Sequence, residues 1–264
     1  MSIDKYQKSL LQHRTHYEHH YIGAASIQLF IKPAKSVILG GNSGIGAAVA
    51  YAVVDRGAKV VLVSRRSVGS ISSGDHSAIL RMSADMTNED SLKKVFSQIG
   101  AFDHLVITAG PAVKAKPLAE TSLTEAQENF DVKLWGALRA IQAALPYLTE
   151  QGSITLTSGL LSRKFISGQF IKTAINAALE AVGKQLAKEL APRRVNIVSP
   201  GVTATEAYSG MNSEQRQAMF TKVSASLPVG RVGQPVDIAS AYILLLENSF
   251  MTGSLIDVEG GGLL

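Results

Sequence analysis

The chain of 264 residues contains no cysteine. This absence excludes disulfide bonds and thiolate metal sites, and it is typical of a protein that works in a reducing compartment. Long apolar runs are missing as well, since no stretch of about 20 apolar residues is available to form a membrane-spanning helix. We therefore expect a cytoplasmic protein with no membrane partner.

Charged residues are also few, at 18% of the chain, and the net charge of +5 is modest. The Lys and Arg residues are dispersed and form no stripe interleaved with aromatic residues, so we expect no nucleic-acid partner. Hydrophobic residues make up 46% of the chain, which is enough for one domain with a large core.

Residues 1–34 differ from the rest because they hold four of the six histidines, namely His13, His16, His19 and His20. Spacings of three and four place some of them on one helical face, but the segment supplies no group to support a bound ion. We therefore predict no metal site. The segment is interpreted as a loosely ordered extension, with an added strand at 22–31 as the alternative.

From residue 35 onwards, short apolar runs alternate with amphipathic stretches. Strands are predicted at 36–39, 59–63, 79–84, 104–108, 153–157, 195–198 and 254–258. Helices are predicted at 44–55, 89–99, 125–148, 171–190 and 235–246. Continuous apolar runs are typical of strands buried on both faces, and intervening helices require parallel pairing. Residues 35–264 are thus predicted to form one α/β domain, a Rossmann-like doubly wound sheet of about seven strands with helices on both faces.

A glycine-rich loop joins the first strand to the first helix, with glycines at positions 40, 44 and 46. Glycine permits the tight turn and lets backbone N–H groups approach an anion at the helix N-terminus. The flanking strand and helix distinguish this loop from an ordinary turn. We predict that it binds a dinucleotide pyrophosphate through Gly40, Asn42, Ser43, Gly44, Ile45 and Gly46.

The second strand ends in Ser64, Arg65 and Arg66. An NAD-selective fold usually holds a carboxylate at the position of Ser64, where it binds the ribose 2′-hydroxyl and repels a 2′-phosphate. A serine does not repel this phosphate, and arginine pairs with it bidentately. The sequence therefore favours NADP(H) as cofactor.

At this point the chain resembles a short-chain dehydrogenase/reductase over about residues 35–264. The resemblance rests on residues 39–46, 85–86, 108–110, 199–205, 230–233 and 252–261. It implies adenine contacts from Asp85 and Met86, and it places Asn176 at the ribose. It also implies cofactor contacts from Ala109, Gly110, Pro200, Gly201, Val202 and Thr205.

The resemblance also implies a catalytic set of Asn, Ser, Tyr and Lys, and this chain departs from it. Lys133 stands in the place of the Asn, and Ser158 keeps the serine that fixes the substrate carbonyl. Lys172 falls in the place of the Tyr, and Asn176 replaces the Lys. Lys172 is therefore the candidate proton donor, with Lys133 in a relay, cofactor-binding or purely structural role.

Three functions stay open. The first is an NADP(H)-dependent oxidoreductase that reduces a carbonyl or enone of a small, fairly apolar substrate, or oxidises the alcohol, with an atypical proton donor. The others are a catalytically silent nucleotide-binding or regulatory protein and a non-redox enzyme on the same fold. The apolar residues of segment 205–226 indicate either a substrate cover or a helix that packs on the sheet.

The resemblance finally implies a homodimer or homotetramer, formed through the helices at 125–148 and 171–190. Small residues on these helices are expected to allow close approach. They are Ala137, Ala140, Ala143, Ala144, Ala177, Ala178 and Ala181.

Overall fold

The structure is a computed structural model that describes residues 34–65, 78–111 and 113–264. The chain divides into a unit Met1–Phe30 and a unit Ile31–Leu264, and every element described below belongs to the second unit. Residues 1–33 of the predicted N-terminal extension and Arg66 lie outside the described residues, whereas Ala34, the last residue of that extension, is buried in the core of the domain.

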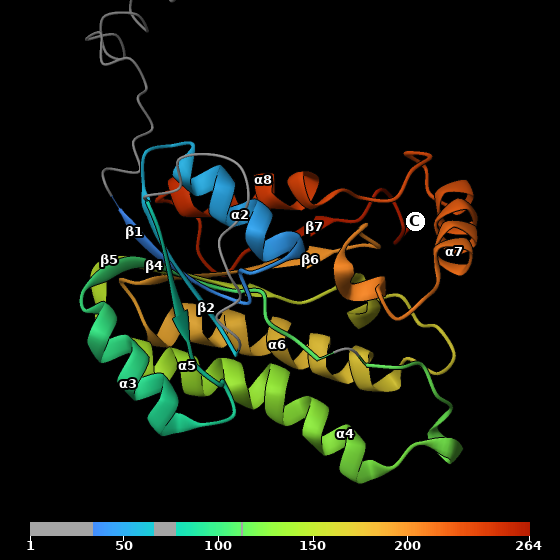
Figure 1. Cartoon of the computed structure of the whole chain (residues 1–264), viewed down its shortest axis with the longest axis horizontal. Helices are drawn as coiled ribbons and strands as arrows, with labels where there is room; N and C mark the ends of the chain where they lie inside the picture. Colours follow the sequence, from blue (N-terminus) through green and yellow to red (C-terminus); the bar gives the residue numbers. More distant parts are fainter. Residues whose placement is uncertain (1–33, 66–77, 112) are drawn as a thin grey trace, which may run out of the picture. The chain divides into compact units, whose positions relative to one another are not determined.

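A single parallel sheet of seven strands forms the centre of the second unit, in the order β3-β2-β1-β4-β5-β6-β7 (Figure 1). The predicted doubly wound sheet is thus confirmed. The chain reverses its winding between β1 and β4, which is where such sheets bind ligands. The strands are β1 (Lys35–Leu39), β2 (Lys59–Ser64), β3 (Ile79–Ser83), β4 (Phe102–Ile107), β5 (Leu148–Thr157), β6 (Arg194–Pro200) and β7 (Leu255–Val258).

Helices cover both faces of this sheet (Figure 1). One face carries α2 (Gly44–Val54) and α8 (Pro235–Glu247), and the other carries α3 (Glu89–Ile99), α4 (Leu123–Phe130), α5 (Gly136–Ala144) and α6 (Phe170–Glu189). Side chains alternate along each strand, so that Val37 and Leu39 join one hydrophobic core while Ile38 joins the other. Burial on both faces explains the continuous apolar runs in the sequence.

The helix predicted over 125–148 is interrupted and ends earlier than expected. A π-helical turn, η2 (Asp131–Trp135), separates α4 from α5, and α5 ends at Ala144. Leu148 already begins β5, so the predicted end of the helix was wrong. Such single π turns are often found at functional sites, and this one carries Lys133.

Segment 205–226 consists of a short 3₁₀ turn, η4 (Glu206–Tyr208), followed by α7 (Ser213–Ser226). Asn212 and Gln215 form a reciprocal capping box at the start of α7. The rings of Tyr208 and Phe220 pack edge to face at 5.5 Å, which ties η4 to α7. No residue of α7 is buried, so this helix does not belong to the core.

None of the helices in the described ranges is long and apolar enough to cross a membrane.

Candidate cofactor and catalytic site

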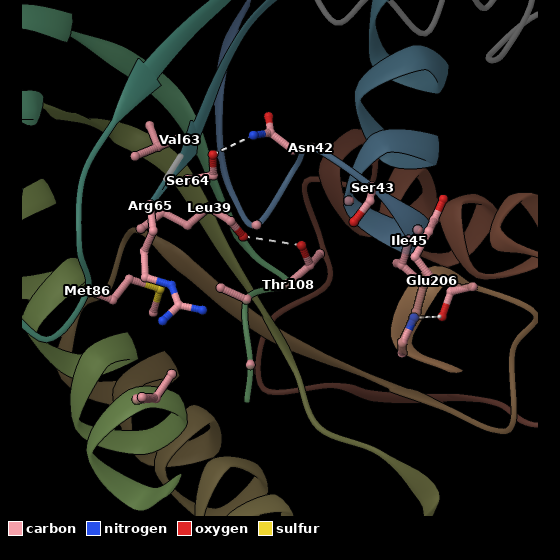
Figure 2. Close-up of a pocket in the computed structure, with 18 of the residues that line it drawn as sticks. Leu39, Asn42, Ser43, Ile45, Val63, Ser64, Arg65, Met86, Thr108 and Glu206 are labelled. Carbon is pink, nitrogen blue, oxygen red and sulfur yellow. Dashed lines mark hydrogen bonds between the residues drawn. The ribbon is translucent and has the colours of Figure 1, made fainter. Parts of the chain in front are cut away.

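A pocket of about 460 Å³ lies at the carboxyl ends of β1, β2, β3 and β4 (Figure 2). Thirteen of the residues predicted to bind the cofactor line it, and they come from the glycine loop, the ends of three strands and the segment before η4. They are Gly40, Asn42, Ser43, Gly44, Ile45, Gly46, Ser64, Arg65, Asp85, Met86, Ala109, Gly110 and Thr205.

The glycine loop is packed so closely that side chains have no room. A Cβ at Gly46 would lie 2.5 Å from the carbonyl oxygen of Gly40, and a Cβ at Gly40 would lie 2.6 Å from the backbone nitrogen of Ala109. The N-cap of α2, Ser43, makes no side-chain capping bond, and the first turn holds no acidic residue. The N–H groups of this turn are therefore suited to an anion, and the loop fits a dinucleotide diphosphate.

Asp85 and Arg65 form a second wall of the pocket. The Asp85 carboxylate accepts hydrogen bonds from the Thr87 backbone at 2.9 Å and from its hydroxyl at 2.8 Å. These bonds, together with the nearby positive charge of Arg65, lower the pKa of Asp85. Figure 2 shows the Arg65 side chain extending beside Met86 into the pocket. This is the corner where adenine and its ribose were predicted to bind.

Several lining residues were missed by the sequence reasoning. Most are direct neighbours of predicted residues, and this adjacency was the signal that could have found them. Val132 lies on the π-helical turn, directly before the predicted catalytic residue Lys133. Glu206 carries a carboxylate to the loop, 3.4 Å from where a Cβ at Gly44 would lie. The missed residues are Leu39, Val63, Ala84, Thr108, Val132, Glu206 and Ala207.

Next to this pocket, Lys133 and Asn176 are joined by a direct hydrogen bond. The Lys133 ammonium donates to Asn176 Oδ1 at 2.8 Å and to the carbonyl oxygen of Ser158 at 3.3 Å. The stem of Lys133 lies against a pocket residue, since a Cβ at Gly110 would lie 3.4 Å from its Cδ. The two residues that the resemblance shows as exchanged thus meet, with the ammonium now supplied by η2 instead of α6.

Lys172 precedes Asn176 by four residues on α6, which places both on one face of the helix. Burial, and secondarily the charge of Lys172, lower the pKa of Lys133 to about 8. Burial also lowers the pKa of Lys172. Within the described part of the chain no carboxylate forms an ion pair with either lysine. The site therefore holds two neighbouring amines that lose their protons at lower pH than ordinary lysines.

Ser158 does not line the pocket. Its side chain is buried, and its hydroxyl donates to Glu180 Oε1 at 2.6 Å. Ser162 donates to the same oxygen, and Arg163 links Glu180 to Asp257. The geometry gives no support to the predicted role of Ser158 at the substrate carbonyl, because its side chain points into this polar network.

Gly159 is the position that lies against the side-chain amide of Asn176. A Cβ at Gly159 would lie 2.9 Å from Asn176 Nδ2, and this amide donates to the Gly159 carbonyl at 3.3 Å. The Ser158 hydroxyl meets the backbone of the same residue, at 3.3 Å from the Asn176 carbonyl oxygen. The Asn176 amide is engaged at both ends within the protein, and the structure does not place it on the pocket lining.

Pro200, Gly201 and Val202 also lie outside the pocket lining, at the end of β6. Gly201 packs closely against the backbone of Glu259, where a Cβ would lie 2.7 Å from the Glu259 Cα. The Pro200 carbonyl lies 3.8 Å from where a Cβ at Gly159 would be. Pro200 thus lies near Gly159, and the predicted contact of these three residues with a nicotinamide stays a prediction.

A family model described as "Enoyl-(Acyl carrier protein) reductase" matches residues 40–262, which is most of the domain. The chain belongs to the short-chain dehydrogenase/reductase family. The resemblance seen in the sequence is thus confirmed, and the seven-stranded sheet agrees with it.

Two named relatives match this short-chain dehydrogenase/reductase over most of its length. It is 33% identical to the short-chain dehydrogenase/reductase ATR9 of Stachybotrys chlorohalonatus over 252 residues, which cover 89% of this chain and 98% of the relative. It is 31% identical to a 3-oxoacyl-[acyl-carrier-protein] reductase of Bos taurus, over 85% of this chain and 95% of the relative.

Among solved structures, a small-chain dehydrogenase in complex with NADPH is 45% identical, with a TM-score of 0.76. The match covers 87% of this chain and 98% of that structure. The membership in a family of oxidoreductases that bind nicotinamide cofactors thus rests on both sequence and fold.

Proposed function

We propose that this protein is an NADP(H)-dependent oxidoreductase that reduces a carbonyl or enone of a small substrate, or oxidises the alcohol, with lysine in place of the usual tyrosine. One observation carries the proposal: Lys133 and Asn176, each in the place where the family pattern has the other, are joined by a 2.8 Å hydrogen bond, so that an ammonium lies beside the pocket. A buried ammonium is costly because it is desolvated, so its presence beside the pocket favours an active site over a catalytically silent one.

A nicotinamide, when bound, supplies or accepts the hydride, and the protein must orient it and manage a proton. The glycine loop and Arg65 hold the nucleotide. Lys172, which has no charged partner among the described residues, gives up the proton. Lys133 holds the Asn176 amide in place and adds positive charge where an oxyanion develops. The aromatic pair Tyr208–Phe220, which joins η4 to α7 next to the pocket residues Glu206 and Ala207, supports a fairly apolar substrate.

The proposal is tested by following NADPH consumption with a panel of ketones, quinones and enones. Steady consumption with at least one carbonyl class supports a reductase. Tight NADPH binding without consumption of any of them would overturn the redox function and leave the silent nucleotide-binding protein as the better explanation.

Cofactor selectivity gives a separate prediction. We expect the protein to bind NADPH more tightly than NADH, and Arg65→Glu to lower this preference about 100-fold, because it removes a charge-assisted bond and adds repulsion toward a 2′-phosphate. Titration followed by cofactor fluorescence measures both affinities. Lys94→Glu makes the same charge change on exposed α3 and should leave the ratio unaltered. An unmoved ratio in Arg65→Glu contradicts the assignment.

We also propose a homodimer or homotetramer, in keeping with the family, although the predicted contact needs correction. Four alanines of the first helix are buried in the chain's own core and are not available for contact, namely Ala137, Ala140, Ala143 and Ala144. Ala177 and Ala181 are exposed on α6, and Trp135 is 54% exposed on η2. Light scattering should give two or four times the chain mass of 28.0 kDa. A monomer at micromolar concentration contradicts this assembly.

A further inference from the structure

Arg81, a residue of β3 outside the predicted site, reaches the wall of the cofactor pocket. Its Nη1 donates to Asn42 Oδ1 at 3.0 Å, and Asn42 Nδ2 in turn donates to Ser64 Oγ at 2.5 Å. The second of these bonds is drawn in Figure 2. A chain of hydrogen bonds therefore links β3, the glycine loop and the end of β2, which are far apart in the sequence.

The chemistry of this chain fixes the orientation of the Asn42 amide. A guanidinium only donates hydrogen bonds, so the amide oxygen must face Arg81 and the amide nitrogen must face Ser64. Both Asn42 and Ser64 line the pocket, and Ser64 stands where NAD-selective folds usually hold a carboxylate. Arg81 thus sets which groups the wall presents at the ribose.

The charge of Arg81 is not neutralised within the described residues, because no carboxylate there forms an ion pair with it. Its Nη2 is buried and has no hydrogen-bond partner among the residues that the structure describes. A buried donor without a partner lowers stability, so packing alone does not explain this residue. A partly buried charge is also screened less by salt than a surface charge.

We propose that Arg81 is a positioning and specificity-determining residue for a cofactor that carries a 2′-phosphate. It orients the Asn42–Ser64 wall and adds a second positive charge behind it, while Arg65 approaches from the open side. This inference rests on the proposed NADP(H) function, and it adds a residue that does not itself line the pocket.

The test compares Arg81→Met with the unaltered protein by titration with NADPH and with NADH, each followed by cofactor fluorescence. We expect the Kd for NADPH to rise about 10-fold and the Kd for NADH to change less than about two-fold, because only NADPH carries the added phosphate. Arg56→Met is the matched control, since Arg56 pairs with Glu247 and the same charge is removed.

Asn42→Ala shows whether Arg81 acts through the amide. In that background the effect of Arg81→Met on the NADPH/NADH ratio should shrink, since the residues are coupled. If Arg81→Met does not fold, Arg81→Lys keeps the charge without the forked donor, and a reduced ratio in this variant supports the proposal.

The inference is overturned if Arg81→Met, or Arg81→Lys where only the latter folds, leaves the ratio unaltered or weakens both cofactors equally. This outcome differs from failure of the proposed function, which the unaltered protein alone decides by showing no preference for NADPH. If the unaltered protein prefers NADPH and the Arg81 variant has the same NADPH/NADH affinity ratio, only the proposed role of Arg81 is contradicted.

Discussion

Replacing Lys172 with methionine is expected to lower kcat for NADPH-dependent carbonyl reduction about 100-fold or more, which is the usual contribution of a positioned general acid. NADPH binding should change less than about two-fold, because Lys172 does not line the cofactor pocket. Burial lowers the pKa of Lys172, which makes it a better proton donor than an exposed lysine. Steady-state kinetics with the best carbonyl of the panel, together with the titration, measure both quantities.

The pH dependence follows from the lysine pair. The pKa of Lys133 is lowered to about 8, so its ammonium is present below pH 8 and is lost as the pH rises above it. Because reduction needs protonated amines, we expect kcat to be highest below pH 8 and to fall above. The apparent value belongs to the coupled pair and not to either lysine. In Lys172→Met the fall of the residual rate should move to higher pH, because Lys133 still titrates but no longer feels the positive charge of Lys172.

Two control variants separate the possible roles. Lys172→Arg keeps the positive charge but holds its proton too firmly to donate it, since the pKa of arginine exceeds about 12. This variant should be nearly as slow as Lys172→Met, and full activity in it would make Lys172 a fixed charge instead of an acid. Ser158→Ala should have little effect on kcat, because the hydroxyl is engaged with Glu180. A 100-fold lower kcat in Ser158→Ala would instead assign Ser158 a catalytic role.

Sequence reasoning predicted the sheet and the nucleotide loop because both depend on local signals. Strands buried on two faces must be apolar throughout, and a loop that holds a phosphate between strand and helix needs glycine at fixed spacings. Arg65 was also predictable, since it follows β2 directly. These features are decided by residues that are neighbours in the chain.

The remaining features depend on contacts between distant segments. The Ser158 hydroxyl is oriented by distant groups, because it donates to Glu180, 22 positions away, and lies 3.3 Å from the carbonyl oxygen of Asn176. The π-helical turn that presents Lys133 has no sequence signature of its own. Arg81 lies 39 positions from its hydrogen-bond partner Asn42, and no local pattern connects them.

Lys133 and Asn176 were interpreted separately in the sequence, and the structure shows that they belong together. In the sequence each of them replaces a catalytic residue of the family pattern, because the asparagine of the long helix and the lysine of α6 are both absent. The 2.8 Å bond between them shows that the amide and the ammonium are in direct contact in this chain, with the ammonium on η2 and the amide on α6. An altered catalytic site is therefore better supported than an abandoned one.

Replacing Gly40 with alanine is expected to abolish tight NADPH binding, with a loss of affinity of at least about 100-fold. Gly40 has a φ of +91°, and an added Cβ would lie 2.6 Å from the nitrogen and 2.8 Å from the Cα of Ala109. Both are backbone atoms, so the ends of β1 and β4 must separate. The hydrogen bonds from Thr108 and Ala109 to the Leu39 carbonyl, at 2.9 and 3.1 Å, then weaken. Thermal unfolding and NADPH titration measure the two consequences.

Gly57→Ala is the matched control for this variant. Gly57 has a similar φ of +80°, but an added Cβ there would meet nothing within 4 Å. Its replacement therefore costs only the left-handed backbone strain, about 1–2 kcal/mol, and leaves the pocket unaltered. We expect Gly40→Ala to lose more stability than Gly57→Ala, and only Gly40→Ala to lose NADPH. The prediction is contradicted if both variants unfold at the same temperature and bind NADPH equally well. Gly40 would then be required only for the backbone turn, and its close contact with Ala109 would not shape the cofactor site.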